Sequence, residues 1–333
     1  MPTPCGPVPV VKTRMSAWDR AQAVAARVGI KRNSHKVAPG LYAMGNPSNE
    51  SPVFVTANYK LSFDALRRGL SGLDAWMLVA DTRGINVWCA AGKRTFSTDE
   101  VALQVVRSGL DRLVSHRRLI LPQLAAPGVS GREVKKKTGF SVSWGPVRAA
   151  DIKAFVDAGY KAEPYMRQVT FPLSERAVLL PVELSAIAKP LAVLILAGFV
   201  LSGIGGGLFS LSAAWHRGLS LAGGLVAAVL AGAVAMPLLL PRLPFVAFSA
   251  KGALTGAALG AAWALATAAG WLEGAALVLL TTGLSSYLAM NFTGSTPFTS
   301  GSGVEKEMRR AMPFQALAVG LALAGWIKAG FAG

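Results

Sequence analysis

The sequence predicts an α/β domain followed by an all-α transmembrane domain. Of its 333 residues 52% are hydrophobic, and a mean hydropathy of +0.44 is high for a wholly soluble chain. Charge is uneven: residues 1–185 carry 26 Lys+Arg and 14 Asp+Glu, whereas residues 186–333 carry only 8 and 3. In the polar front part, short β-rich runs alternate with helical segments, which indicates a mainly parallel, doubly wound sheet of the Rossmann-like kind.

The front part begins with residues 1–50, a Pro-rich leader and a helix over 16–28 that has Ser16 as its N-cap. The α/β domain is predicted over residues 51–185. Its expected elements, in chain order, are a strand at 52–57, a helix at 61–70, a strand at 73–81, a helix at 98–108, strands at 112–115 and 118–121, a helix at 132–138, a strand at 140–144, a helix at 149–158 and one or two closing strands within 169–183. Ser97 and Glu100 have the spacing of a capping box at the start of the second helix.

The transmembrane domain is predicted over residues 186–333. Its apolar runs are long enough to cross a bilayer at about 188–209, 219–240, 250–271, 273–290 and 312–331. With five spans, the front domain lies on the same side of the membrane as two of the segments between spans, namely the second connection (between the second and third spans) and the fourth (between the fourth and fifth). Those connections hold the basic residues Arg242, Lys251, Lys306, Arg309 and Arg310, whereas the opposite connections hold only Arg217 and Glu273. The positive-inside rule therefore predicts a multi-pass protein of the cytoplasmic membrane, with the front domain in the cytoplasm and the carboxyl terminus outside.

The spans are rich in small residues, a pattern that lets helices pack closely. The glycine-rich stretch at 203–207 has no strand before it and no Lys-Ser/Thr after it, so helix packing explains it better than phosphate binding. No span carries a convincing acidic residue near its centre, so a transport path is not required. No apolar stretch precedes residue 20, and we expect no signal peptide.

The sequence has only two cysteines, Cys5 and Cys89. Two thiols cannot build an iron–sulfur cluster, which normally takes four thiolates. Cys5 lies in the Pro-rich leader and does not suggest a disulfide, which points to a reducing compartment. The three histidines are too scattered for a zinc-type cluster.

Cys89 lies between the predicted strand at 73–81 and the helix at 98–108, at the carboxyl end of a strand, where open α/β sheets bind their ligands. The small residues Ala90, Ala91 and Gly92 would let a short helical turn lie flat against a large planar ligand. A thiolate in the first turn of a helix and near a cation such as Lys93 is favoured as a metal ligand or nucleophile. An equally good alternative is a buried cysteine that packs as a small hydrophobe.

The stretch around Cys89 resembles the signature of the mercury-methylating corrinoid protein family (HgcA). The residues that carry this resemblance are Asn86, Val87, Trp88, Cys89, Ala90, Ala91, Gly92 and Lys93. Further similar segments lie at 55–66, 115–117, 122–128, 145–148 and 291–294. The resemblance implies a Rossmann-like corrinoid-binding domain, similar to that of corrinoid iron–sulfur proteins, in which a cap helix presents Cys89 as the lower axial ligand of cobalt.

The resemblance also implies an activity. The protein would be an anaerobic, corrinoid-dependent methyltransferase that passes a methyl group from Cys89-ligated methylcobalt to inorganic Hg(II), giving methylmercury. The implied partners are a ferredoxin-like electron donor with two [4Fe-4S] clusters, a methyl donor derived from methyl-folate, and membrane lipid; nucleic acid is not expected. One alternative is a membrane-anchored corrinoid methyl carrier of a carbonyl/folate pathway. Another is a soft-metal membrane transporter or sensor that uses Cys89 without turnover.

A corrinoid has a wide ring, amide side chains and a phosphate-bearing tail, so its pocket should offer small residues, backbone N–H groups and hydroxyls at strand ends. We expect Trp88 to anchor the cap helix in the core, Asn86 to cap it, and His116 to be a hydrogen-bonding pocket residue or a structural one. For the strand-end residues, ordinary roles in turns and caps are alternatives. The complete predicted cofactor site comprises Thr56, Asn58, Asn86, Val87, Trp88, Cys89, Ala90, Ala91, Gly92, Lys93, His116, Gly128, Val129, Gly145 and Pro146, with Cys89 as the catalytic residue and metal ligand.

Overall fold

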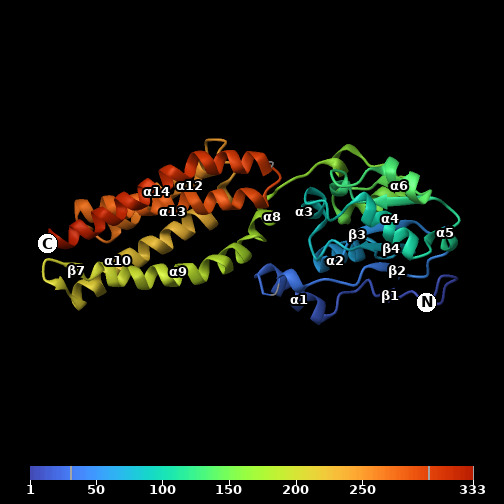
Figure 1. Cartoon of the computed structure of the whole chain (residues 1–333), viewed down its shortest axis with the longest axis horizontal. Coiled ribbons are helices and arrows are strands. Elements are labelled where there is room, and N and C mark those ends of the chain that lie inside the picture. The colour runs from blue at the N-terminus through green and yellow to red at the C-terminus, as the bar shows by residue number, and fades with distance from the viewer. Residues whose placement is uncertain (31, 299–300, 333) are drawn as a thin grey trace. The chain divides into compact units, whose positions relative to one another are not determined.

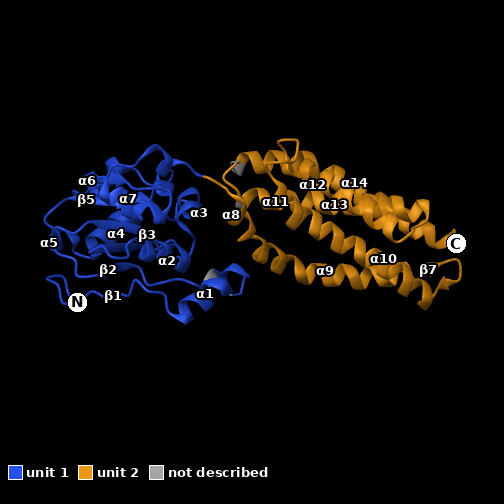
Figure 2. Cartoon of the chain, turned by 180° about the vertical axis from the view of Figure 1, so that it is seen from behind, with its two compact units in different colours: residues 1–169 blue, residues 170–333 orange. Residues whose placement is uncertain are grey.

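The computed structural model describes residues 1–30, 32–298 and 301–332 and divides the chain into two compact units. The first unit, Met1–Val169, holds the sheet, and the second, Thr170–Gly333, is helical (Figures 1 and 2). The boundary lies earlier than the one predicted at 185, because helices already begin in the segment expected to close the sheet.

The sheet of the first unit has six strands in the order β1-β2-β4-β3-β5-β6. Their bounds are β1 Val10–Val11, β2 Gly40–Met44, β3 Val53–Ala57, β4 Ala75–Ala80, β5 Arg118–Leu121 and β6 Ser141–Trp144. β3, β4, β5 and β6 run parallel, and β2 pairs antiparallel to β4. Since β1 and β2 come from the first 50 residues, the leader contributes an edge to the sheet and belongs to the same unit.

Helices cover both faces of this sheet. One apolar core joins the sheet to α2 (Lys60–Gly69) and α7 (Ile152–Asp157), through side chains such as Phe63 and Phe155. The other core joins the opposite face to α4 (Thr98–Arg107), α5 (Leu110–Leu113) and α6 (Gly131–Thr138). Every residue of β3 and β4 is buried, as expected for central strands covered on both faces. The doubly wound α/β prediction is therefore confirmed for this unit.

The strand order places a topological switch point between β3 and β5. From β3 the chain first forms β4 on one side and then crosses back to form β5 on the other. The carboxyl ends of the four parallel strands therefore meet along one edge of the sheet, and loops that leave neighbouring strands in opposite directions leave room for a ligand there. Cys89 belongs to α3 (Val87–Gly92), the short helix that follows β4.

Most elements lie where the sequence predicts them. Helix α1 (Ala17–Arg27) is capped by Ser16, and the short 3-10 turns η1 (Arg32–Ser34), η2 (Gln123–Ala125), η3 (Ala149–Asp151) and η4 (Pro164–Arg167) complete the unit. Two strand predictions are wrong. Residues 112–115 lie partly in α5, which begins after the left-handed Gly109. Residues 169–183 contain no strand but lead into helices that have Pro172 and Pro181 at their starts, positions where proline favours a helix.

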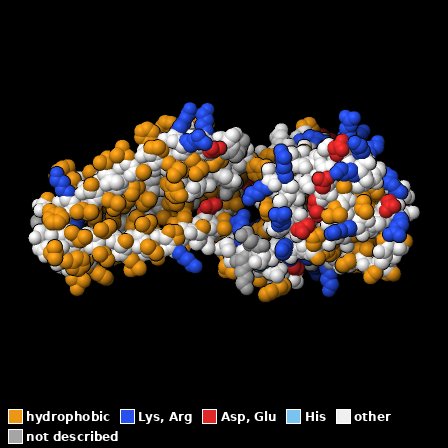
Figure 3. All heavy atoms as spheres, viewed as in Figure 1, with side chains coloured by type: hydrophobic (Ala, Val, Ile, Leu, Met, Phe, Trp, Pro, Cys, Tyr) orange, Lys and Arg blue, Asp and Glu red, His pale blue; other side chains and the backbone are white. Residues whose placement is uncertain are grey.

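The second unit is made of long apolar helices. Its elements are α8 Leu173–Ala177, α9 Leu180–Ser202, the hairpin β7 Ile204–Gly205 with β8 Leu208–Phe209, α10 Leu211–Val229, the π-helical turn η5 Leu230–Ala235, α11 Met236–Leu239, α12 Phe248–Ala266, α13 Trp271–Phe292, η6 Thr293–Ser295 and α14 Gly301–Phe331. On the face seen in Figure 3, apolar side chains cover much of this unit, whereas Lys, Arg, Asp and Glu side chains are frequent on the α/β unit.

Within the described residues, four helical segments are long and apolar enough to cross a membrane: residues 173–202, 211–239, 271–292 and 302–331. The predicted span at 250–271 coincides with α12, which is helical but includes Lys251 and many small residues and is not among the four. The predicted span at 188–209 is also too long, because the chain turns through the β7–β8 hairpin after Ser202. The glycine-rich stretch at 203–207 thus lies in a turn and not within a helix.

Small residues on α12 allow close packing against α13. A methyl group added at Gly256 would lie 2.5 Å from the Thr281 carbonyl oxygen, and one at Gly252 would lie 2.6 Å from that of Ser285. The predicted role of small residues in helix packing is confirmed here.

Candidate functional site

The loop between β4 and α3 is organised by the buried side chain of Asn58 at the end of β3. Its Oδ1 accepts hydrogen bonds from the backbone N–H groups of Thr82 (3.0 Å) and Gly84 (2.9 Å), and its Nδ2 donates to Asp81 Oδ1 (2.9 Å). The Thr82 hydroxyl lies 2.6 Å from the Ile85 carbonyl oxygen, to which it donates. Asn58 was predicted to contact a cofactor directly; the structure instead shows it fixing the loop that carries α3.

Glu100 braces the same loop from α4. Its Oε1 accepts the Asp81 N–H at 2.6 Å, and Gln104 Nε2 donates to the same oxygen at 2.9 Å. The capping box predicted at the start of α4 is therefore only half formed. Ser97 accepts the Glu100 N–H at 3.2 Å, but the Glu100 carboxylate accepts from Asp81 and Gln104 and not from the Ser97 N–H. Arg83 adopts a left-handed conformation (φ 59°) that its N–H contact to Asp81 Oδ1 helps to hold.

Helix α3 begins at Asn86, which both caps the helix and touches the thiol. Asn86 Oδ1 accepts the Cys89 N–H at 2.9 Å, and Asn86 Nδ2 lies 3.4 Å from Cys89 Sγ in donor geometry. The predicted capping role of Asn86 is confirmed. Cys89 itself is a free, exposed thiol, so the alternative of a buried structural cysteine is wrong.

The faces of α3 differ from the prediction. Ala90 and Ala91 are buried against the protein, whereas Cys89 and Gly92 face outward and Trp88 is 37% exposed. The two alanines thus do not form an outward platform, and Trp88 is not the core anchor. Their small size instead lets the backbone of α3 pack closely on the protein. Bulky side chains at these two inward positions would hold this six-residue helix farther from the core.

Gly128 provides the seat for α3. A methyl group added there would lie 2.3 Å from the Phe96 carbonyl oxygen and 2.9 Å from Ala91 Cα. Gly128 was predicted as a cofactor contact, but its backbone meets the inner side of α3. Phe96 is itself fully buried in the core beneath this segment. Only a residue without a side chain fits between these two backbones.

The remaining predicted residues divide between two edges of the sheet. Thr56, Val129, Gly145 and Pro146 belong to the carboxyl edge or its loops but are buried, so they shape the edge from beneath. His116 precedes β5 and therefore lies at the amino edge. Its Nε2 lies 2.9 Å from the Ser51 carbonyl oxygen, which precedes β3, and its Nδ1 accepts the Arg118 N–H at 3.3 Å. These contacts support the structural role, one of the two roles predicted for His116.

Three residues of the loop before α3 help to hold the site but were not predicted as part of it: Asp81, Thr82 and Gly84. Their position directly after a buried strand was a usable signal, because Asp, Thr and Gly at such a point are typical of a hydrogen-bonded turn. Their partner across the sheet, Asn58, could be placed near them only once β3 and β4 are known to be neighbours.

The chemistry at this edge comes from a single thiol. Among the described residues, no group of three or more His, Cys, Asp or Glu side chains could hold a metal ion. The other cysteine, Cys5, is half-buried, and its Sγ contacts the Gly109 carbonyl oxygen at 3.0 Å, next to the turn between α4 and α5. The exposed basic residues Arg83, Lys93 and Arg94 flank the thiol in the loop–helix–loop segment. The site can therefore offer one sulfur ligand, with cations near it.

Comparisons with known proteins concern this same unit. Residues 30–156 match the family of the CO dehydrogenase/acetyl-CoA synthase delta subunit. Similar curated proteins are gamma subunits of the acetyl-CoA decarbonylase/synthase complex: that of Archaeoglobus fulgidus is 30% identical over 131 residues (39% of this chain, 27% of the relative), and that of Methanopyrus kandleri is 32% identical over 128 residues (38% and 27%).

A third relative, the gamma subunit from Methanothermobacter thermautotrophicus, is 31% identical over 147 residues, 42% of this chain and 31% of its own length. The chain thus spans less than a third of the length of these relatives. The family match ends at residue 156, before the helical unit begins, and contains β2 to β6 and α3. The part of the chain that forms the candidate site is therefore similar to subunits of the CO dehydrogenase/acetyl-CoA synthase system.

Proposed function

We propose that the α/β unit binds a corrinoid at the carboxyl edge of its sheet, with Cys89 as an axial cobalt ligand, and takes part in methyl transfer. The observation that carries this proposal is the exposed thiol of Cys89, held by Asn86 on a helix that follows a central parallel strand. The comparisons support the corrinoid through the similarity of residues 30–156 to acetyl-CoA decarbonylase/synthase subunits.

The residues present fit such a cofactor. A corrin macrocycle already binds its cobalt, so the protein would need to supply only a single ligand, which the exposed Cys89 thiol could be; among the described residues no group of three or more His, Cys, Asp or Glu side chains forms a metal site of its own. Gly92 lies beside Cys89 on the outer side of α3, and a methyl group added there would meet nothing within 4 Å. Cys89 would therefore hold the metal while Trp88 and Gly92 border the ring, and Lys93 suits a phosphate-bearing tail.

When bound, a corrinoid supplies a cobalt centre that can accept and release a methyl group. The chain's own contribution is positional. Asn86 directs an N–H toward the sulfur and fixes the first turn of α3 through Cys89 N–H. Asn58 and Glu100 hold the preceding loop, and the close contact at Gly128 keeps α3 against the protein. Such outer contacts typically tune a metal ligand's orientation and donor strength.

The identity of the methyl acceptor is the finer part of the proposal. The names of the relatives favour a membrane-anchored methyl carrier of a carbonyl/folate pathway, because they are subunits of a complex named for acetyl-CoA decarbonylation and synthesis. With only two cysteines in the chain, any iron–sulfur cluster that this chemistry needs must belong to a partner. A ferredoxin-like protein with two [4Fe-4S] clusters would meet that need, and a methyl-folate-derived compound would be the methyl donor.

The second candidate acceptor is inorganic Hg(II), which would make the protein a mercury methyltransferase. It is favoured by the resemblance of residues 86–93 to the mercury-methylating corrinoid proteins and by the exposed position of the Cys89 thiol. A strongly donating thiolate axial ligand suits transfer of the methyl group to an electrophile, and Hg(II) is a soft electrophile. A soft-metal transporter or sensor remains the alternative without turnover.

We also propose that the helical unit anchors the protein in the cytoplasmic membrane. Four of its helical segments are long and apolar enough to span a bilayer. Basic residues near the start of α14 and in the α11–α12 connection, such as Arg242, Lys306 and Arg309, would face the cytoplasm together with the α/β unit. The end of α14 lies beside β7, since a methyl group added at Gly330 would be 2.4 Å from the Ile204 carbonyl oxygen. In this proposal the end of α14 and the α9–α10 connection would both lie on the outer side.

A single experiment separates these functions. Full-length protein, purified anaerobically from membranes and loaded with a methylated corrinoid, is given either Hg(II) with a reduced cluster protein or an acetyl-CoA synthase with CO and coenzyme A. Methylmercury that depends on Cys89 supports the mercury methyltransferase, and acetyl-CoA formation alone supports the carrier. Failure of the wild-type protein to take up corrinoid would overturn both and leave the transporter or sensor.

A further inference from the structure

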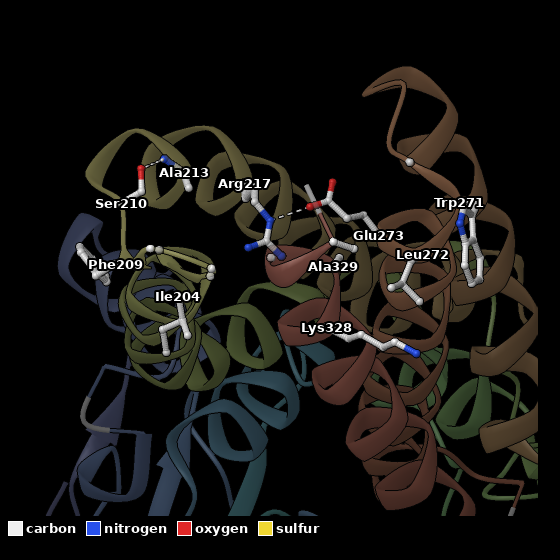
Figure 4. Close-up of a pocket in the computed structure, with 17 residues that line it drawn as sticks. Ile204, Phe209, Ser210, Ala213, Arg217, Trp271, Leu272, Glu273, Lys328 and Ala329 are labelled. Carbon is white, nitrogen blue, oxygen red and sulfur yellow. Dashed lines mark hydrogen bonds and ion pairs between the residues drawn. The ribbon is translucent and has the colours of Figure 1, made fainter.

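A cavity of about 640 Å³ lies in the helical unit, remote in sequence from the Cys89 segment. Its walls come from the glycine-rich turn at 203–207, the first two turns of α10, the start of α13 and the end of α14 (Figure 4). Most of its lining is apolar or backbone, and its charged side chains are Arg217, Glu273 and Lys328.

Arg217 is committed to holding the helices together. Its Nε contacts Glu273 Oε1 at 2.6 Å, its Nη1 donates to the Ser202 carbonyl oxygen at 3.0 Å, and its Nη2 donates to that of Trp326. The guanidinium also lies 5.0 Å from the Trp326 ring centroid. Arg217 thus ties α10 to α9, α13 and α14, and its charge is matched by that of Glu273.

Two polar groups of the cavity are left for a ligand. Across the part of the chain that the structure describes, the Lys328 ammonium group has no hydrogen bond or ion pair with protein. Glu273 pairs with Arg217 through Oε1, and its Oε2 has no protein partner. The cavity therefore presents one cation, supplied by Lys328, and one carboxylate oxygen, supplied by Glu273. A methyl group added at Gly206 or Gly207 would meet nothing within 4 Å, so the glycine-rich turn leaves open space beside them.

The rim of the cavity has the composition of a membrane–water interface. Trp271 is 83% exposed and Phe209 is 52% exposed, and both line the cavity. Leu208 and Phe331, which adjoin lining residues in the sequence, are also largely exposed. Aromatic side chains and the tips of lysines near helix ends are typical of the depth at which lipid headgroups lie.

We propose that this cavity binds the headgroup of a phospholipid that carries a primary amine. Its phosphate would pair with Lys328, its ammonium would donate to Glu273 Oε2, and its acyl chains would pass the exposed Trp271 and Phe209. An anionic headgroup without an ammonium would leave Glu273 Oε2 without a charged donor, and a quaternary ammonium has no N–H to donate. This inference rests on the membrane placement proposed above.

The test uses delipidated full-length protein in detergent and native mass spectrometry with phosphatidylethanolamine, phosphatidylcholine and phosphatidylglycerol. We expect phosphatidylethanolamine to bind about tenfold more tightly than the other two lipids. Lys328→Gln should weaken binding of all three, and Glu273→Gln, which keeps an acceptor for Arg217, should abolish the preference for phosphatidylethanolamine over phosphatidylglycerol. Lys306→Gln, an exposed change at the start of α14, is the matched control and should alter nothing.

Equal affinity for the three lipids, or binding unchanged by Lys328→Gln, would overturn the proposal. Soluble phosphoethanolamine is added as a competitor: if it displaced the lipid at comparable concentration, the site would serve a soluble ligand and the lipid assignment would be wrong. Alkaline carbonate extraction of the same variants from membranes keeps the two proposals apart. A protein that stays in the membrane but shows no lipid preference contradicts only the headgroup site, whereas a protein that is extracted contradicts the membrane placement.

Discussion

Asn86 is the residue on which the position of the Cys89 thiol depends most directly. Its Oδ1 accepts the Cys89 N–H at 2.9 Å while its Nδ2 reaches the sulfur, so one side chain fixes both the helix start and the thiol. The sequence alone showed an Asn at the right spacing for a cap. It could not show that the same amide also contacts the sulfur, because that depends on the side-chain conformations of both residues.

Replacing Asn86 should separate these two contacts. We expect Asn86→Ala to lower the free energy of unfolding of the α/β unit by about 1 kcal/mol, the usual effect of losing an N-cap, and to weaken corrinoid binding. Asn86→Asp keeps the capping oxygen but removes the N–H that faces the sulfur, so it should retain stability and still weaken corrinoid binding. Urea unfolding and cobalt content measure the two effects. Normal cobalt content in both variants would show that the amide does not orient the thiol.

His116 provides a contrasting prediction at the same scale. Because it lies at the amino edge and contacts the Ser51 carbonyl oxygen, His116→Ala should lower the unfolding free energy by about 1 kcal/mol, the typical net contribution of a hydrogen bond, and leave the spectrum of the bound corrinoid unchanged. A spectral change comparable to that of a Cys89 variant would contradict its placement away from the site. Thermal unfolding and a visible spectrum suffice for this comparison.

At the scale of elements, the position of α3 depends on its packing contacts more than on the intrinsic stability of the helix. A helix of six residues has little intrinsic stability, so its orientation depends on contacts with Gly128 and the buried Ala90 and Ala91. The sequence predicted the turn and its cap, and it left open whether the Cys89 thiol is buried or available to a ligand. It could not reveal which face of so short a helix points inward, because the periodicity of six residues does not distinguish the two faces.

Two glycines, Gly128 at the inner face of α3 and Gly92 at its outer face, test whether α3 is held by close packing on the protein. Gly128→Ala should displace α3, because the new methyl group would lie 2.3 Å from the Phe96 carbonyl oxygen, and it should lower stability by about 1–3 kcal/mol, as overpacking usually does. Gly92→Ala meets open space and should leave the unfolding free energy unchanged or slightly raised. Urea unfolding of both variants decides the matter. Equal stability of the two would mean that α3 is not seated on Gly128.

A network of charges joins α1 to α2. Lys60 Nζ lies 2.8 Å from Asp19 Oδ1 and 2.5 Å from Asp64 Oδ2, and Arg67 Nη2 lies 3.0 Å from Asp19 Oδ2. Burial raises the pKa of Asp19, but hydrogen bonds from Lys60, Ser16 and Arg67 outweigh it and hold the pKa well below its ordinary value of 3.8. The network therefore stabilises the folded state when Asp19 is ionised.

The sign of the pH dependence follows from that depressed pKa. The stabilisation is fully present above the unfolded pKa near 4 and is lost as the pH falls below it toward the lower folded pKa. We expect the protection of α1 amides, measured relative to their intrinsic exchange rates at each pH, to fall as the pH falls through this range, and Asp19→Asn to lower that protection already at neutral pH. Exchange in α1 that is equally slow in both proteins at neutral pH would show that the network does not hold this helix.

At the scale of the whole molecule, charge and hydropathy predicted the division into two units because polar and apolar residues occupy different halves of the sequence. The sheet prediction succeeded where strands are short, apolar and bounded by turns. It failed at residues 169–183, which contain apolar residues but form the starts of helices at prolines. Whether such a short apolar run becomes a strand or a helix depends on tertiary packing. Likewise α12 was predicted as a span from its small apolar residues, although the glycines that let it pack on α13 also lower its hydropathy.

The independence of the two units leads to a prediction for each. Residues 1–169 form a compact unit with their own apolar cores, so this fragment should be produced in aqueous buffer, fold cooperatively and bind corrinoid. The full-length protein should remain in membranes after carbonate extraction. Size-exclusion chromatography and circular dichroism of the fragment test the first statement. Aggregation of the fragment under all conditions would indicate that the α/β unit needs the helices to fold.

The most direct test of the account is the anaerobic visible spectrum, with cobalt analysis, of full-length protein supplied with corrinoid, measured beside Cys89→Ala. If the thiol of Cys89 is the axial ligand, the wild-type protein will contain cobalt in proportion to protein, and the absorption bands of the variant will shift while its circular dichroism stays that of a folded protein. Identical spectra for the two proteins, or no cobalt in either, would contradict the assignment of Cys89 as the residue that holds the cofactor.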